Sequence, residues 1–298
     1  MKKALALILT ASLLTGVLTA CGSSKAQTDA AETTTEEAAA EETADTDAQE
    51  ETGDLQVITV AATAVPHAEI LEAAKPILAE QGYDLQVTVF DDYVQPNEVV
   101  EAGDIDCNYF QHIPYLNSYN EERGTHLVSV GEIHYEPIGI YAGTESDLSN
   151  ISDGADIAIP NDTTNEARAL LILQDNGIIT LKEDAGIDAT INDIAENPHN
   201  INFVEMEAAQ VSKVLSEVAF AVINGNYALD AGLNAQTDAL VSETSDSLAA
   251  QTYVNVVVVK EGNEDNEGVK ALVNVLKSDD IKKFIEETYE GAVVPFEG

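Results

Sequence analysis

The strongest constraint on the fold is the alternation of apolar strand-like runs with helical patterns from Leu55 to the end of the chain. The first pair is typical. Residues 55–63 (LQVITVAAT) read as a strand, and apolar side chains from Ile70 to Leu78 then recur at helical spacing as far as Gly82. Because successive parallel strands need crossover connections, the repeated alternation predicts an α/β architecture with mostly parallel sheets.

Two continuous apolar strands, near residues 137–142 and 253–259, bracket a middle segment that has its own strand and helix patterns. This arrangement predicts two lobes, each a sheet flanked by helices, joined by two crossing strands. One lobe would contain residues 55–138 plus 253–298, and the other residues 139–252. Since ligands of open α/β sheets bind at the carboxyl ends of strands, we expect the binding site in a cleft between the lobes.

The first 21 residues carry a targeting signal. Lys2 and Lys3 precede an apolar run from Ala4 to Val17, which is too short to span a bilayer and has the dimensions of a signal peptide. The run ends in LTACG, which resembles the lipobox of bacterial lipoproteins. We therefore predict a signal peptide over residues 1–20 and a lipid anchor, such as palmitate, on Cys21. The anchor would hold the folded part at the extracytoplasmic face of the cell membrane.

Acidic side chains dominate the segment that follows. Residues 28–54 contain 11 acidic residues, no basic residue and no aliphatic side chain larger than alanine. Such a segment cannot bury enough apolar surface to offset the entropy of ordering it, so we expect residues 21–54 to form a disordered tether. The whole chain has 54 acidic and 13 basic side chains, a formal net charge of −41. This charge repels phosphate backbones and excludes nucleic acid as a partner.

The sequence lacks the motifs of common enzymes and metal sites. It has no GxSxG, P-loop or GxGxxG pattern, so we expect a protein that is not an enzyme and needs no cofactor. The five histidines show no HxH or HExxH spacing, so we expect no metal site. They are His67, His112, His126, His134 and His199. Cys107 would be a lone thiol, more typical of a small core residue than of a nucleophile.

Polar side chains gather just after predicted strands, in the strings FDDYVQPN, NYFQHIPYL, IPNDTTNEARAL and AVINGNYA. In the third string, Thr163 and Glu166 have the spacing of a capping box, which predicts a helix N-terminus with Arg168 in its first turns. One guanidinium beside a helix N-terminus suits a carboxylate ligand. The alternative is that Arg168 pairs with a neighbouring acidic side chain.

Asn255 interrupts the apolar run TYVNVVVV, and an asparagine in a central strand needs a polar partner if it is buried. Its partner is either a ligand or the backbone where the chain crosses between lobes. Aromatic rings concentrate in residues 93–115 and 134–135 of a chain that is only 5% aromatic. They favour an apolar or thioether ligand, with core packing as the alternative for Tyr109 and Tyr115.

Taken in order, seven segments resemble the NlpA/MetQ family of lipid-anchored methionine-binding receptors of ABC uptake systems. They are VPHAEILE, DYVQPNE, DIDCNYFQHIPYL, LVSVGEIHYEPIGIY, IAIPNDTTNEARALLILQ, ENPHNINFVEMEAAQ and AVINGNYAL. The resemblance runs from about Val57 to Pro295. It implies a two-lobed periplasmic-binding-protein fold, type II-like, that closes over an amino acid and delivers it to a permease with a cytoplasmic ATPase.

The resemblance also implies the ligand and its contacts. The ligand would be L-methionine or a close relative, such as D-methionine or a methionine-containing dipeptide. Arg168 would bind its carboxylate, Asn224 and Asn255 its amine and carboxylate, and the aromatic rings its thioether. The implied contacts are Tyr93, Phe110, His112, Tyr135, Asn165, Arg168, Asn224 and Asn255. The alternatives are a surface adhesion or signalling lipoprotein that keeps the fold, and a metal-ion receptor.

Overall fold

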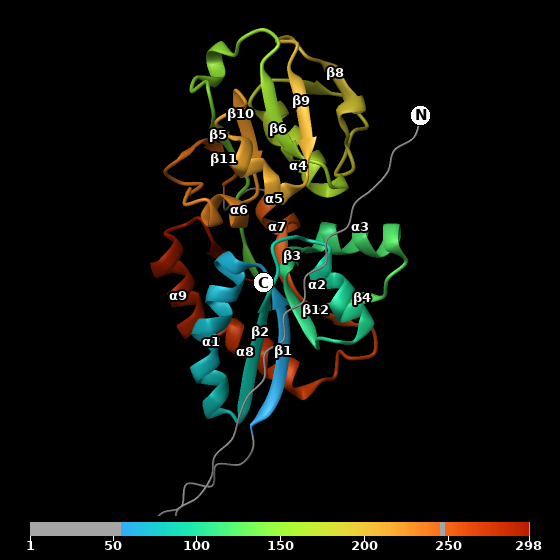
Figure 1. The fold of residues 1–298 in the computed structure, drawn as a ribbon, viewed down its shortest axis with the longest axis vertical. Helices are drawn as coiled ribbons and strands as arrows, with labels where there is room; N and C mark the ends of the chain where they lie inside the picture. The colour runs from blue at the N-terminus through green and yellow to red at the C-terminus, as the bar shows by residue number, and fades with distance from the viewer. Residues whose placement is uncertain (1–54, 245–247, 298) are drawn as a thin grey trace, which may run out of the picture. The chain divides into compact units, whose positions relative to one another are not determined.

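The computed structural model describes residues 55–244 and 248–297 (Figure 1). The predicted signal peptide, the predicted lipidation site Cys21 and the predicted acidic tether lie outside the described residues. Within the described ranges, no helix is long and apolar enough to cross a membrane.

The described residues form an α/β fold with two main sheets. Sheet A contains β1 (Gln56–Ala62), β2 (Tyr83–Val89), β3 (Cys107–His112), β4 (Leu127–Tyr135), β12 (Val254–Lys260) and β13 (Val294–Pro295), in the order β13-β4-β12-β3-β1-β2. Sheet B contains β5 (Gly139–Ala142), β6 (Asp156–Pro160), β9 (Asn202–Met206), β10 (Phe220–Ile223) and β11 (Ala239–Ser242), in the order β11-β5-β10-β6-β9. The short strands β7 (Thr180–Leu181) and β8 (Ile194–Glu196) pair separately.

The helices cover both faces of each main sheet. The α-helices are α1 (Glu69–Glu80), α2 (Gln95–Ala102), α3 (Ile113–Arg123), α4 (Thr163–Asp175), α5 (Ala208–Val211), α6 (Gly225–Asp230), α7 (Leu248–Thr252), α8 (Glu267–Leu276) and α9 (Asp279–Tyr289). Short turns of other helix types are η1 (Ala64–Ala68), η2 (Leu148–Asn150), η3 (Ile191–Asp193) and η4 (Ser212–Val214).

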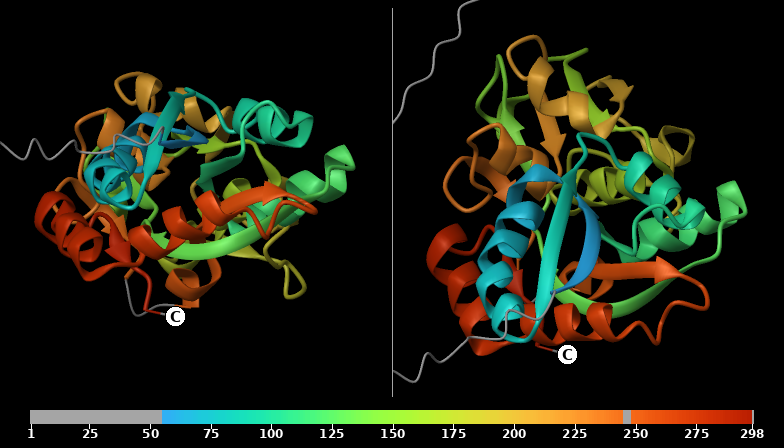
Figure 2. Two further views of the ribbon diagram at one scale, coloured as in Figure 1. Left: turned by 90° about the horizontal axis from the view of Figure 1, so that it is seen from below. Right: turned by 60° about the horizontal axis from the view of Figure 1, so that its bottom comes forward.

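Strand β12 has a continuous apolar run from Val256 to Val259, because it is covered on both sides. Val257 and Val259 pack with α1, α8 and α9, which lie together on one face of sheet A (Figure 2). Val256 and Val258 point to the opposite face and pack with α2 and α3. Sheet B is covered in the same way, by α4 on one face and by α5 and α6 on the other. Strands buried on both faces lose the polar alternation of half-exposed strands.

The expectation of mostly parallel sheets is wrong, because both main sheets are mixed. In sheet A, β1 is parallel to β2 and β3, whereas β12 runs antiparallel to both of its neighbours, β3 and β4. In sheet B, β6 is parallel to β9 and β10, whereas β5 is antiparallel to β10 and β11. The chain leaves sheet A after β4 and returns from sheet B through β12. The returning strand enters between β3 and β4 in the opposite direction and needs no crossover helix.

This return brings distant polar residues into register. Asn255, at the start of β12, pairs with His112 at the end of β3 and with His134 near the end of β4. The ends of β6 and β10 in sheet B lead directly into α4 and α6. Polar side chains from both sheets therefore meet where the chain crosses between them.

Candidate functional site

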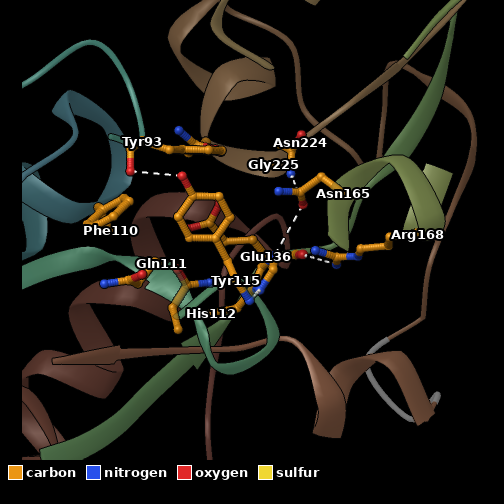
Figure 3. Close-up of a pocket in the computed structure, with 12 residues that line it drawn as sticks. Tyr93, Phe110, Gln111, His112, Tyr115, Glu136, Asn165, Arg168, Asn224 and Gly225 are labelled. Atoms are coloured by element: carbon orange, nitrogen blue, oxygen red, sulfur yellow. Dashed lines mark hydrogen bonds between the residues drawn. The ribbon is translucent and has the colours of Figure 1, made fainter. Parts of the chain in front are cut away.

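A small buried cavity lies where these strand and helix ends meet (Figure 3). Its volume is about 20 Å³, little more than the roughly 10–15 Å³ that holds one water molecule. Seven of the eight predicted ligand contacts line it, and Tyr135 does not. The lining residues are Tyr93, Phe110, Gln111, His112, Tyr115, Glu136, Asn165, Arg168, Asn224, Gly225, Asn226 and Asn255.

The start of α4 orients Asn165 toward this cavity. The predicted capping box is wrong: the N-cap is Asp162, whose Oδ1 accepts from the backbone N–H of Asn165 at 3.1 Å. Glu166 instead accepts from the backbone N–H of Ile191. Asp162 Oδ1 also accepts from Asn165 Nδ2 at 2.7 Å. With its amide nitrogen held in this way, Asn165 presents Oδ1 to the cavity, 3.1 Å from His112 Nε2.

Arg168 is buried and already paired. Its Nε donates to Glu243 Oε1 at 3.0 Å, and its Nη2 donates to Glu243 Oε2 and to the backbone oxygen of Glu136. Burial opposes the charged form, but the Glu243 carboxylate outweighs this effect and raises the pKa of Arg168. The guanidinium also lies 4.3 Å from the ring centroid of Tyr253. Glu243 is therefore the acidic partner that the sequence allowed as an alternative. Among the described residues, Nη1 of Arg168 has no hydrogen-bond partner.

Tyr135 lies behind Arg168 rather than at the cavity wall. Its hydroxyl donates to Glu243 Oε2 at 2.6 Å, and its ring centroid is 5.7 Å from the guanidinium. Glu243 also accepts from the backbone N–H of Ile138. No sequence pattern indicates Glu243, because it follows β11, a strand that the pattern of apolar residues does not predict.

Asn224 presents an acceptor that lacks a donor. Its Nδ2 donates to Asn165 Oδ1 at 2.7 Å, but its buried Oδ1 has no partner in the described part of the chain. A buried polar atom left without a partner costs about 1–3 kcal/mol. The side chain lines the cavity, so a molecule that entered the cavity with a donor group would remove this cost.

Glu136 lines the same cavity, close to Gly225. A Cβ atom on Gly225 would lie 2.8 Å from Glu136 Cβ, so only glycine allows this approach. The backbone N–H of Asn226 donates to the Glu136 carboxylate, while burial raises the pKa of Glu136. The site therefore has an acidic side chain in reach of the cavity, opposite in charge to Arg168.

Two buried histidines hold the Glu136 carboxylate from behind. His134 Nε2 lies 2.7 Å from Glu136 Oε1, and His67 Nε2 lies 3.4 Å from the same oxygen. Burial lowers the pKa of His67 to about 4 and the pKa of His134 to about 3, so both rings are neutral near pH 7. Within the described residues these three side chains are the one group that could hold a metal ion.

No sequence pattern indicates this group, because His67 lies far from the other two members in the chain. His67 and His134 are separated by 67 positions and come from η1 and β4. The only local signal is the spacing of His134 and Glu136, which are two residues apart at the end of a strand. That spacing points two side chains to the same face, but it does not say that His67 joins them.

Aromatic rings close the other side of the cavity. Tyr93 packs against Phe110 and Tyr115, with ring centroids 5.8 and 5.6 Å away. The Tyr115 hydroxyl donates to the backbone oxygen of Tyr93 at 3.0 Å (Figure 3). Tyr93 also donates to Asn226 Oδ1, and Tyr227 donates to the backbone oxygen of Asp91 at 3.1 Å. Residues between β2 and α2 are thereby joined to α6.

A second, larger cavity continues beyond these rings. It has a volume of about 310 Å³ and shares Tyr93 and Tyr115 with the first cavity. Asp162 also lines it, and burial raises the pKa of Asp162 to about 6. The aromatic rings therefore separate a small polar cavity from a larger space.

Comparison with known proteins gives consistent matches over the described part of the chain. The model of a family described as NlpA lipoprotein matches residues 58–297. The methionine-binding lipoprotein MetQ of Bacillus subtilis is 41% identical over 242 residues, which cover 80% of this chain and 87% of that protein.

Two solved structures extend the comparison. A lipoprotein from Ruminococcus gnavus is 66% identical with a TM-score of 0.80, over 81% of this chain and all of that one. A nutrient-binding protein from Burkholderia cenocepacia bound to methionine is 41% identical with a TM-score of 0.76, over 80% of this chain and 99% of that one.

Proposed function

Because the chain belongs to the NlpA lipoprotein family, we propose that it captures L-methionine, or a close relative such as D-methionine or a methionine-containing dipeptide, for uptake by an ABC permease. Its relatives are substrate-binding proteins, and the chain is not an enzyme. The name of the Bacillus subtilis relative and the methionine bound to the Burkholderia cenocepacia protein support this choice of ligand.

The observation that carries the proposal is the unpartnered Oδ1 of Asn224 in a buried cavity that Glu136 also lines. An acceptor and an anion in one buried cavity suit the ammonium group of an amino acid. Arg168 lies at the same cavity and retains donors on Nη1 for a carboxylate. The cavity thus offers opposite charges to the two charged groups of one amino-acid backbone.

The ring cluster of Tyr93, Phe110 and Tyr115 supports a thioether side chain. Sulfur and aromatic rings attract each other by about 0.3–1.5 kcal/mol per contact. The larger cavity behind Tyr93 and Tyr115 has room for such a side chain. In our proposal the ligand backbone occupies the small polar cavity and its side chain extends between the rings.

Binding requires the site to open, because the small cavity holds about one water molecule. We propose that the lobes built on sheet A and sheet B separate and then close over the ligand. Opening would break the hydrogen bonds from Tyr93 to Asn226 and from Tyr227 to Asp91. These contacts join elements of the two lobes and would form again on closure.

We further propose that the protein works at the extracytoplasmic face of the cell membrane, held by a lipid on Cys21. Its relatives include a membrane lipoprotein of Treponema pallidum, which supports this location. The partners would then be a permease in the same membrane and its cytoplasmic ATPase.

Two measurements test the ligand. Mass spectrometry of small molecules released from natively purified protein should detect methionine or its relatives. Calorimetric titration should show binding of L-methionine and at least tenfold weaker binding of N-acetyl-L-methionine, which lacks the ammonium group. The variant Asn224→Ala should lose about 1–3 kcal/mol of binding free energy. The matched control, Asn202→Ala on exposed β9, should bind normally. No binding of any methionine derivative would refute the proposal.

A further inference from the structure

We propose that His67, His134 and Glu136 form a binding site for a divalent transition-metal ion such as Zn²⁺, directly behind the amino-acid cavity. Their ligand atoms lie within 4.8 Å of one another, and all three side chains are buried. Two imidazoles and one carboxylate are a ligand set that zinc accepts, with a fourth position left for another ligand. The site does not depend on the proposed function.

The spacing of the three ligand atoms requires little rearrangement. Bonds of about 2.0–2.2 Å keep any two ligand atoms of one ion within about 4.4 Å of each other. Glu136 Oε1 meets this limit with both rings, at 2.7 Å from His134 Nε2 and 3.4 Å from His67 Nε2. Small rotations of the side chains are enough for the most distant pair, which lies within 4.8 Å.

The surroundings of both rings fit metal coordination. The hydroxyl of Thr63 lies 2.8 Å from His67 Nδ1, and the hydroxyl of Tyr109 contacts His134 Nδ1. When an ion occupies Nε2, the ring proton lies on Nδ1 and can be donated to these hydroxyl oxygens. Hydrogen bonds of this kind fix the orientation of metal-bound histidines. Both Nε2 atoms already face the Glu136 carboxylate.

The charge balance also favours a cation here. Glu136 supplies the negative charge. Asn255 Oδ1, 3.1 Å from His67 Nε2, offers a fourth ligand atom.

The position of the site implies competition with the amino acid. Glu136 and Asn255 line the amino-acid cavity as well as facing the histidines. An ion bound to Glu136 would use the carboxylate that an ammonium group needs. This competition, unlike the metal site, rests on the proposed function. Metal titrations without amino acid therefore test the site separately.

The test is titration of the purified full chain with Co²⁺, followed by displacement with Zn²⁺. We expect one equivalent of Co²⁺ to give the visible absorption of a tetrahedral ion with nitrogen ligands, and Zn²⁺ to remove it. The variants His67→Gln, His134→Gln and Glu136→Gln should each abolish this absorption. Thr63→Val, which removes only the outer hydrogen bond, should weaken binding by about 10–100-fold.

The two histidines outside the cluster and the cavity supply matched controls. Exposed His126, which lies 3.6 Å from Glu101, and half-buried His199 should be replaceable by glutamine without loss of the absorption. Absorption that survives Glu136→Gln and His134→Gln in folded protein, or that is lost only in the His126 variant, would overturn the proposal. Absence of any tetrahedral absorption in the unaltered chain would overturn it too. Circular dichroism establishes whether each variant is folded. If a histidine variant unfolds, the nearly isosteric variant Glu136→Gln tests the metal site in its place.

Discussion

Arg168 and Glu243 form a buried two-point ion pair, although they are 75 residues apart in the sequence. Nε contacts one carboxylate oxygen at 3.0 Å and Nη2 contacts the other. The pair fixes the guanidinium plane and leaves Nη1 for other partners. The cation proposed to bind the ligand carboxylate therefore also has a structural role.

This pair predicts different behaviour for its two members. Arg168→Ala should lower the stability of the ligand-free protein by up to about 3–5 kcal/mol, because it leaves the largely buried Glu243 carboxylate without its partner. It should also abolish methionine binding. Glu243→Gln should lower stability as well, yet bind methionine at least as tightly, because Arg168 keeps its charge. Thermal melting and calorimetric titration separate the two effects. An equal loss of methionine affinity in both variants would contradict the role of Arg168 as the carboxylate partner.

A second prediction concerns the close approach of Gly225 and Glu136. Gly225→Ala would place a methyl group 2.8 Å from Glu136 Cβ and 3.0 Å from Oε2. We expect a loss of about 1–3 kcal/mol in stability, together with weaker methionine binding as the carboxylate is displaced. Gly186→Ala is the matched control, because an added Cβ there meets no atom within 4 Å. Equal melting temperatures and affinities for the two variants would argue against this contact.

The third prediction is a loss of stability in acid. Burial lowers the pKa of His67 to about 4 and the pKa values of His112 and His134 to about 3. These histidines take up protons near pH 6.5 in the unfolded chain but only near pH 3–4 in the folded protein. The contribution of the three neutral rings to the free energy of unfolding is therefore present above pH 6.5 and declines below it. At pH 5 each ring should lower the free energy of unfolding by up to about 2 kcal/mol. Asp162 opposes this trend, because burial raises its pKa to about 6.

Denaturant titrations at pH 7.5 and pH 5 measure this dependence. His112→Gln should reduce the difference in unfolding free energy between the two pH values, whereas His126→Gln, at an exposed position, should leave it unchanged. The account of the buried rings fails if both variants keep the full difference.

The fourth prediction concerns the anchor. Cys21→Ala should release the protein from membranes without changing methionine affinity, because no described residue of the cavity precedes Tyr93. Cell fractionation and titration of the released protein check both parts. A Cys21→Ala protein that still sediments with membranes after removal of the signal peptide would disprove the lipid anchor.

Much of the fold follows from local patterns. The predicted two-lobed periplasmic-binding-protein fold is confirmed by its solved neighbours. Strands such as β12 and helices such as α1 lie where apolar spacing predicts them, since burial on one or two faces leaves a clear pattern in the sequence. The predicted lobe boundaries at residues 138/139 and 252/253 stay predictions. Strand direction was missed, because the return of β12 into sheet A depends on the second crossing and not on any local pattern.

Some residues of the site can likewise be predicted from local patterns, and others cannot. Asn165, Arg168 and Asn224 follow strands or begin helices, so their place near the cavity can be predicted from position alone. The pairing of Glu243 with Arg168, and the contact of His67 with His134 and Glu136, join residues 67 or more positions apart. Such contacts leave no periodic signal, and only the folded structure reveals them.

The most direct test of amino-acid binding is a crystal structure of the protein grown with L-methionine. We expect the ligand ammonium within hydrogen-bond distance of Asn224 Oδ1 and Glu136, its carboxylate on Arg168, and its sulfur among the rings of Tyr93, Phe110 and Tyr115. A methionine bound outside this cavity, or bound with its ammonium facing Arg168, would contradict this expectation.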